Sequence, residues 1–134
     1  MTTYMKIREA TMLNPLQLAY IGDVIWEAIV RCKLVCERKS VHHMHTECVQ
    51  LVNANAQSHW LEIIKSSLSE QELLIVQRGR NAHARHPSPR NQNPSDYSES
   101  TGFEALIGFL YLTGNTDRIS FFCDVIFRKE QSYA

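Results

Sequence analysis

Two acidic residues stand out because each lies in a segment that is otherwise mostly apolar. Asp23 lies within LQLAYIGDVIWEAIVRC, and Glu104 lies within FEALIGFLYL, in which eight of ten residues are apolar. A helix that is apolar all round is buried, and an ionised carboxylate there is costly unless it is paired or binds a metal ion. Two such carboxylates that meet in space form an oxygen site suited to Mg²⁺, which accepts one or two carboxylates together with waters and a phosphate.

Both acids also fit simpler interpretations. Asp23 also fits a thin solvated strip of a core helix that holds Glu27 and Arg31. Glu104 also fits an exposed position near a helix start, where a negative charge is favourable. Gly108, one helical turn after Glu104, leaves room there for a neighbouring helix or a ligand.

Residues 78–96, RGRNAHARHPSPRNQNPSD, carry a local positive charge. The segment has four arginines and one aspartate, a net charge of +3, whereas the whole chain has 14 basic and 14 acidic residues. The balanced charge of the whole chain excludes a polycation that coats nucleic acid. For residues 78–96, the simpler interpretation is a solvated surface loop. Arginine suits bidentate contacts with phosphate, so the segment points to a phosphodiester backbone. The candidate RNA-binding residues are Arg78, Arg80, Asn81, His83, Arg85 and Arg90.

The elements that must position these residues are predicted to be five to seven helices in a single all-α domain. The length of 134 residues fits one domain, and no stretch alternates apolar and polar residues long enough to indicate a half-buried sheet. Capping residues and prolines mark the helix starts. The expected starts are Asn14 with Pro15, Ser40 for a helix running on toward Ile64, Ser69 with Glu72 as a capping box, Ser95 or Asp96, and Thr116, with Gly114 as a stop and 81–94 as a loop.

The helix expected over residues 17–35 has more apolar residues than one face can hold. One apolar stripe, which we expect to face the core, consists of Leu18, Ile21, Ile25, Ala28 and Cys32. Tyr20 and Trp26 lie off this stripe and have no obvious partners in so small a core. A two-fold interface with a second copy would bury them, so we predict a homodimer with Tyr20 and Trp26 at its interface.

The cysteines and histidines indicate neither a disulfide scaffold nor a zinc site. The spacing of Cys32, Cys36, Cys48 and Cys123 predicts reduced, mostly buried thiols. The segment HHMHTEC superficially resembles a soft-metal cluster, but solvated helix residues are the better interpretation. No run approaches the ~20 apolar residues of a membrane helix, and MTTYMKIREA lacks the apolar segment of a signal peptide, so we expect a cytoplasmic protein.

Taken together, the motifs resemble the ribonuclease III catalytic domain. The family's signature helix carries Leu-Gly-Asp, matched here by Tyr20-Ile21-Gly22-Asp23-Val24. A later family helix of the form Phe-Glu-Ala-Leu-(Ile/Val)-Gly is matched by residues 103–108, and RGRNA is found at 78–82. The resemblance covers about residues 14–128 of one domain spanning 1–134 and leaves no residues for a double-stranded RNA-binding domain. The chain is therefore similar to the compact Mini-III branch.

This resemblance implies an all-helical homodimer that cleaves double-stranded RNA with Mg²⁺, for which Mn²⁺ can substitute. It also implies a role in maturation of the large-subunit (23S) ribosomal RNA precursor, with a ribosomal protein as a possible further partner. Asp23 and Glu104 match the family's acids and are therefore the expected catalytic residues and metal ligands. A cation held there would activate water for attack on the phosphodiester and leave a 5′-phosphate on the product.

The sequence departs from the larger enzymes of the family at two positions. They carry two further acids where this chain has Ala19 and Thr101. Either one Mg²⁺ dominates, or a second ion depends on waters, substrate phosphates and outer groups such as Glu27 or Glu99. Two rival functions remain: a non-catalytic double-stranded RNA-binding module that has lost its second acids, and a helical interaction protein without an RNA role.

Overall fold

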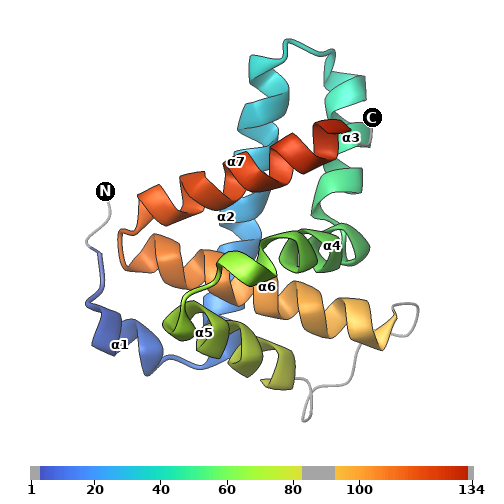
Figure 1. The fold of residues 1–134 in the computed structure, drawn as a ribbon. Coiled ribbons are helices and arrows are strands. Elements are labelled where there is room, and N and C mark those ends of the chain that lie inside the picture. The colour runs from blue at the N-terminus through green and yellow to red at the C-terminus, as the bar shows by residue number, and fades with distance from the viewer. Residues whose placement is uncertain (1–3, 83–92, 133–134) are drawn as a thin grey trace.

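The computed structural model describes residues 4–82 and 93–132, and these form seven α-helices, one short 3₁₀ helix and no strand. The predicted all-α fold is therefore confirmed. Figure 1 shows the path of the chain. The helices are α1 (Ile7–Thr11), α2 (Pro15–Cys36), α3 (Val41–Val52), α4 (Ala54–Ile64), η1 (Lys65–Ser67), α5 (Glu70–Asn81), α6 (Pro94–Leu112) and α7 (Thr116–Ser132).

Side-chain caps begin most of these helices where the sequence predicts. Asn14 caps α2 ahead of Pro15, and Ser69 caps α5 in a reciprocal capping box with Glu72. The start of α6 is the exception, because neither Ser95 nor Asp96 is its cap. Asn93 takes that role, since its Oδ1 accepts hydrogen bonds from the backbone N–H groups of both residues. These bonds satisfy donors that the first turn of a helix would otherwise leave unpaired.

The single helix expected from Ser40 toward Ile64 is in fact two helices. Asn53 has an extended backbone, with φ −69° and ψ 165°, so it ends α3. Its side chain then accepts a hydrogen bond from the backbone N–H of Ala56 and caps α4. The chain turns sharply at this point, which directs α4 back toward α6 (Figure 1).

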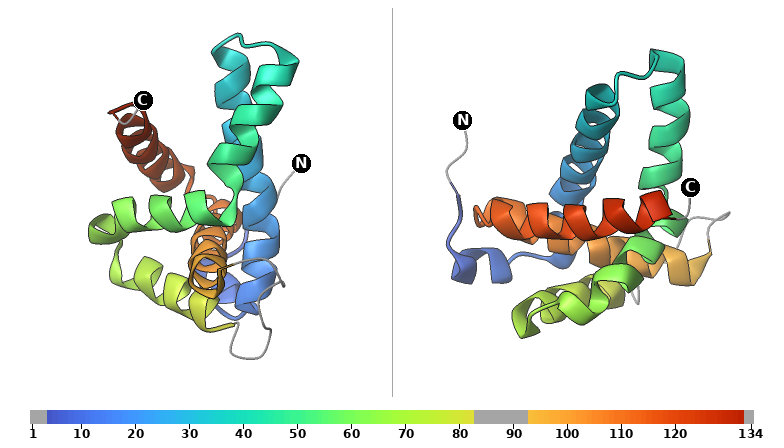
Figure 2. Two further views of the ribbon diagram at one scale, coloured as in Figure 1. Left: turned by 90° about the vertical axis from the view of Figure 1, so that its right-hand side faces the viewer. Right: turned by 45° about the horizontal axis from the view of Figure 1, so that its top comes forward.

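Helix α6 lies at the centre of the fold. It packs against α2, α4, α5 and α7, and the views of Figure 2 show these helices arranged around it. Every residue from Ser100 to Leu110 is buried except Glu104, which is half-buried. The expectation that the segment around Glu104 lies within the core is therefore confirmed.

The face of α2 that packs on the core is not the expected stripe. Its fully buried side chains are those of Leu18, Trp26, Val30 and Leu34. Ala28 and Cys32 are exposed, whereas Ile21 and Ile25 are half-buried at the edge of the core. Three residues of the predicted stripe, Ile25, Ala28 and Cys32, instead help to line an apolar hollow. Its other lining residues are Ile29, Tyr111, Thr116, Ile119 and Ser120.

Trp26 was predicted at a dimer interface, and this prediction is wrong. Its side chain is fully buried in its own subunit, where its ring lies edge-on to Phe103 with 5.0 Å between centroids and is stacked with Phe127. Its Nε1–H donates to the backbone carbonyl of Leu51. Trp26 therefore had partners from distant segments that the sequence did not reveal. Tyr20, the other predicted interface residue, is 82% exposed.

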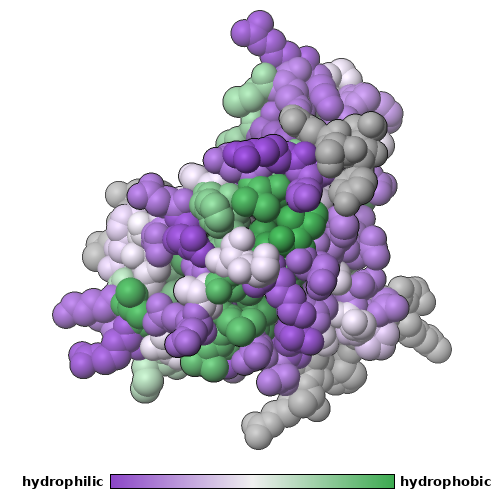
Figure 3. All heavy atoms as spheres, in the orientation of Figure 1, coloured by the Kyte–Doolittle hydropathy of each residue, from purple (hydrophilic) through white to green (hydrophobic). Residues whose placement is uncertain are grey.

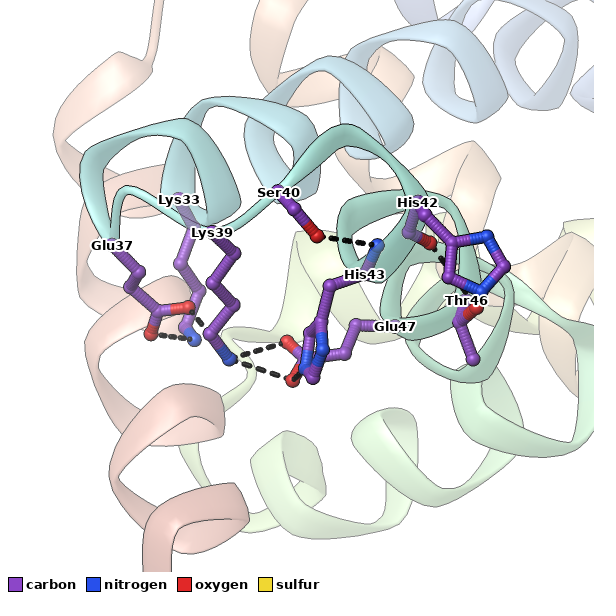
Figure 4. Close-up of polar contacts among 8 residues, drawn as sticks. All are labelled: Lys33, Glu37, Lys39, Ser40, His42, His43, Thr46 and Glu47. Carbon is purple, nitrogen blue, oxygen red and sulfur yellow. Dashed lines mark hydrogen bonds and ion pairs between the residues drawn. The ribbon is translucent and has the colours of Figure 1, made fainter.

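The end of α2 and the start of α3 extend beyond the helices around α6 as a hairpin (Figure 1). Ion pairs hold its two sides together, as Figure 4 shows. Lys39 lies between the carboxylates of Glu37 and Glu47, at 3.5 and 2.6 Å, and Lys33 pairs with Glu37 at 2.9 Å. His43 Nε2 lies 2.8 Å from Glu47 Oε1. Because these groups are partly exposed, each pair contributes little to stability by itself.

The N-terminal segment is attached to the rest of the fold at two places. The backbone N–H of Met5 donates to the carbonyl of Leu112 at the end of α6, and the ring of Tyr4 lies against Gly114. Gly114 has a φ of +75°, a conformation that favours glycine, and it ends α6 as predicted. Further along, Arg78 of α5 donates to the carbonyls of Thr11 and Leu13.

The four cysteines are all free thiols, as expected, but the expectation that most are buried is wrong. Cys48 is buried and Cys123 is half-buried, whereas Cys32 and Cys36 are exposed on α2.

Across the part of the chain that the structure describes, no helix is both long and apolar enough to cross a membrane. Figure 3 shows that apolar side chains gather in the middle of one face, around η1 and α7.

Candidate active site at the crossing of two helices

The backbones of α2 and α6 touch where they cross, because a glycine stands on each side. A Cβ atom at Gly22 would collide with the backbone carbonyl of Glu104, and one at Gly108 would collide with the carbonyl of Leu18. The room that Gly108 leaves is therefore filled by a helix. The crossing explains how two acids far apart in the sequence meet, since Asp23 directly follows Gly22 and Glu104 is the residue that Gly22 contacts.

The carboxyl groups of Asp23 and Glu104 lie within hydrogen-bonding distance of each other. The pKa of Glu104 is raised from its usual 4.5 to about 8, chiefly because the carboxyl is buried and in addition because of the hydrogen bond and the negative charge of Asp23. The side-chain amide of Gln57 acts in the opposite direction. Asp23 is exposed whereas Glu104 is half-buried, so the pair opens to solvent on the side of Asp23. The expected convergence of the two acids is present in the structure.

Two carboxyl groups this close fit a hard divalent cation, because its positive charge would offset both the cost of burying an ionised Glu104 and the repulsion from Asp23. Within residues 4–82 and 93–132, no group of three or more His, Cys, Asp and Glu side chains is placed to hold a metal ion. Ala19 and Thr101 are both buried, and the Thr101 hydroxyl donates to the carbonyl of Tyr97. Within the part of the chain that the structure describes, a cation bound here would therefore take its carboxylate ligands from Asp23 and Glu104.

The two outer acids considered from the sequence are both engaged with arginines. Glu27 pairs with Arg31 on the same helix at 3.1 Å. Glu99 pairs with Arg80 of α5 at 2.9 Å, which joins α5 to α6. A supporting role for Glu27 or Glu99 at the metal remains a prediction.

The basic segment begins close to the acids. Gly79 of α5 packs directly against Gly102 of α6, two residues before Glu104, with 2.9 Å between the Gly102 Cα atom and the position of a Cβ at Gly79. The guanidinium groups on either side of Gly79 have different surroundings. Arg78 is half-buried and donates to two backbone carbonyls at 2.8 Å, whereas Arg80 is exposed and paired with Glu99.

The remaining residues predicted to bind RNA divide into two groups. Asn81 is exposed at the end of α5. His83, Arg85 and Arg90 lie outside the residues that the structure describes. The contacts of Arg78 show a role in attaching the segment before α2 to α5, which the sequence did not reveal.

Sequence reasoning missed Gln57, whose side chain is 1% exposed beside Glu104. A signal was present in the sequence of α4. The buried residues of this helix are Ala56, Gln57, Trp60, Leu61 and Ile64, so a single polar residue lies on an otherwise apolar helical face.

Comparison with known proteins identifies the class to which this fold belongs. Residues 16–115 match the family model described as the ribonuclease III domain. The crystal structure of a Fusobacterium nucleatum protein superimposes with a TM-score of 0.81 at 28% identity, covering 89% of this chain and 95% of that one.

Curated relatives narrow the class further. The protein from Symbiobacterium thermophilum named Mini-ribonuclease 3 is 43% identical over 118 residues, which cover 87% of this chain and 89% of the relative. Proteins of the same name from Clostridium tetani and Brevibacillus brevis are 37% and 39% identical, each over 84% of this chain and over 75% and 84% of the relatives. The chain therefore belongs to the ribonuclease III family, among the Mini-ribonuclease 3 proteins, and is an endoribonuclease of the ribonuclease III type.

Proposed function

We propose that the protein is a Mg²⁺-dependent endoribonuclease that cleaves double-stranded RNA in maturation of the large-subunit (23S) ribosomal RNA precursor. The observation that supports this proposal best is the pairing of the Asp23 and Glu104 carboxyl groups at a solvent-accessible helix crossing. Mn²⁺ is expected to substitute, because it accepts the same oxygen ligands. A cytoplasmic location and assistance by a ribosomal protein belong to the same proposal.

Asp23 and Glu104 are the residues that would hold the cation. When bound there, Mg²⁺ lowers the pKa of a coordinated water and offsets negative charge on the phosphate. Glu104 must lose its proton to serve as a ligand, and Asp23 faces the solvent from which the RNA arrives. The product carries a 5′-phosphate, because water attacks the phosphorus and the 3′-oxygen leaves.

The basic segment is the proposed contact with the RNA backbone. Arg80 is exposed at the end of α5, and Asn81 follows it. Because α5 packs on α6 at Gly79 and Gly102, these side chains emerge near the acids. Arginine contacts with phosphates provide binding that depends on salt rather than on sequence. Arg85, Arg90 and His83 extend the proposed contact along the chain.

The surface of α2 supports the proposed homodimer. Tyr20 is 82% exposed and Val24 is 59% exposed, although both are large apolar residues. The apolar hollow lined by Ala28 and Cys32 lies on the same helix. An isologous contact across this surface would bury these side chains and would place two pairs of acids in one assembly. Such an assembly suits a duplex, which offers two strands to cut and is recognised largely by shape and backbone.

The decisive test measures cleavage of a radiolabelled RNA duplex with Mg²⁺ and with EDTA. Asp23→Asn and Glu104→Gln should each abolish cleavage and leave the fold and the dimer intact. Glu62→Gln, at an exposed position of α4, is the matched control and should retain full activity. Cleavage by either acid variant at the wild-type rate would refute the proposed site, and binding without cleavage by the wild type would favour the non-catalytic module.

A second test concerns the basic segment. Replacing Arg80, Arg85 and Arg90 by alanine should weaken duplex binding and reduce the slope of log K against log salt concentration. The slope falls because binding through fewer phosphate contacts releases fewer counterions from the RNA. An unchanged slope would contradict the proposed contact.

A further inference from the structure

Gln57 is a buried amide without an evident role in the fold. Its side chain is 1% exposed on the face of α4 that packs against α6. No hydrogen-bond partner for its Nε2 is found among the residues that the structure describes. Leaving a buried N–H group unpaired is unfavourable, and buried polar groups in native proteins nearly always have partners.

The position of this amide suggests which group it serves. It lies beside the carboxyl group of Glu104, close enough to act on it. The hydrogen bond is not formed with good geometry, since Nε2 remains unpaired in the structure. An apolar side chain at position 57 would match the rest of this helix face, which consists of Ala56, Trp60, Leu61 and Ile64. The donor is therefore present without stabilising the cation-free fold.

We infer that Gln57 is a positioning residue for Glu104. When the Glu104 carboxylate binds a cation, the amide N–H of Gln57 donates to one of its oxygens and leaves the other oxygen directed at the ion. This inference rests on the proposed metal site. Groups that hydrogen-bond to a metal ligand from behind fix its orientation and support its affinity. The arrangement explains why a donor without a partner is kept in the core beside the half-buried acid.

Two variants test this role, and both replace the amide donor with an apolar side chain of similar size. Gln57→Met keeps the length of the side chain, and Gln57→Leu matches the neighbouring residues of α4. Because the unpaired amide disappears, both variants should unfold at the same temperature as the wild type, or higher, in EDTA. Titration calorimetry with Mn²⁺ should show binding weakened by about 10- to 100-fold, the usual effect of losing such a partner.

Cleavage assays add a second readout. The apparent Mg²⁺ concentration for half-maximal cleavage should rise by a similar factor, and the rate at saturating Mg²⁺ should fall less. Gln50→Leu, at an exposed position of α3, is the control and should change neither quantity.

The outcomes separate this inference from the proposed function. Unchanged Mn²⁺ binding in Gln57→Met and Gln57→Leu would overturn the inference, as would a lower unfolding temperature of both variants in EDTA, which would show that the amide supports the fold. If Asp23→Asn and Glu104→Gln still bind Mn²⁺ as tightly as the wild type, the proposed metal site itself fails.

Discussion

Glu104 should destabilise the cation-free protein at alkaline pH, and replacing it with glutamine should remove that effect. Below pH 4.5 the carboxyl is neutral in both the folded and the unfolded chain. Between pH 4.5 and about 8 the unfolded chain loses the proton while the folded protein keeps it, so the free energy of unfolding falls as pH rises. Above pH 8 both forms are ionised and the difference is constant.

The size of the effect follows from the two pKa values. A tenfold change in a proton-binding constant corresponds to about 1.4 kcal/mol. A rise of the pKa from 4.5 to about 8 therefore corresponds to a loss of at most about 5 kcal/mol of stability at pH 9. For a domain of this length, the unfolding temperature should differ by on the order of 10 °C. Glu104→Gln has no proton to lose there, and its amide can donate to Asp23.

The assay is thermal unfolding followed by circular dichroism, in EDTA, at several pH values from 4 to 9. The variant and the wild type should unfold at similar temperatures at pH 4, and the variant should become increasingly more stable toward pH 9. Added Mg²⁺ should stabilise the wild type at pH 8.5 and leave Glu104→Gln unchanged. Glu62→Gln controls for the loss of an exposed negative charge. Parallel pH profiles for the wild type and Glu104→Gln would refute the reasoning.

Three further substitutions test the packing around the site. Gly22→Ala should force α2 and α6 apart, destabilise the fold by about 1–3 kcal/mol or more and reduce cleavage at saturating Mg²⁺, as measured by urea unfolding and the duplex assay. Arg78→Met should lower the urea midpoint, because two charge-assisted hydrogen bonds worth about 1.5–3 kcal/mol each are lost, and should leave the salt dependence of RNA binding unchanged. Trp26→Ala should cost about 3–5 kcal/mol independently of protein concentration, since its contacts lie within one subunit; a cost that varies with concentration would restore it to the interface.

Local features of the fold could be predicted well from the sequence. The caps at Asn14, Ser40 and Ser69 and the stop at Gly114 depend on neighbouring residues alone, so their sequence pattern suffices. The predicted start of α6 lies two or three residues too late, because Asn93 competes with Ser95 and Asp96 for the role of cap. The break at Asn53 was missed, since a single asparagine in a helical pattern is compatible with either outcome.

The two faces of α2 show where sequence reasoning ends. Periodicity identifies an apolar stripe but does not say whether the stripe meets the same chain or remains at the surface. The surroundings of Trp26 come from Leu51, Phe103 and Phe127, all distant in the sequence. The chemistry of the two acids left open whether Asp23 and Glu104 meet, and the resemblance to the family implied that they do, whereas the proposed role of Gln57 requires knowing that α4 packs against α6.

The attachments at the two ends of the chain bear on what folds as a unit. The region that matches the family model, residues 16–115, contains both acids. However, it omits the carbonyls of Thr11 and Leu13 that receive the Arg78 guanidinium, and the buried side chains of Phe122 and Ile126. A shortened chain limited to the matched region would retain Asp23 and Glu104. It would, however, lose the buried side chains of α7 and leave the Arg78 guanidinium without its two carbonyl partners. The unit that buries the complete core is therefore wider than the stretch that matches the family model.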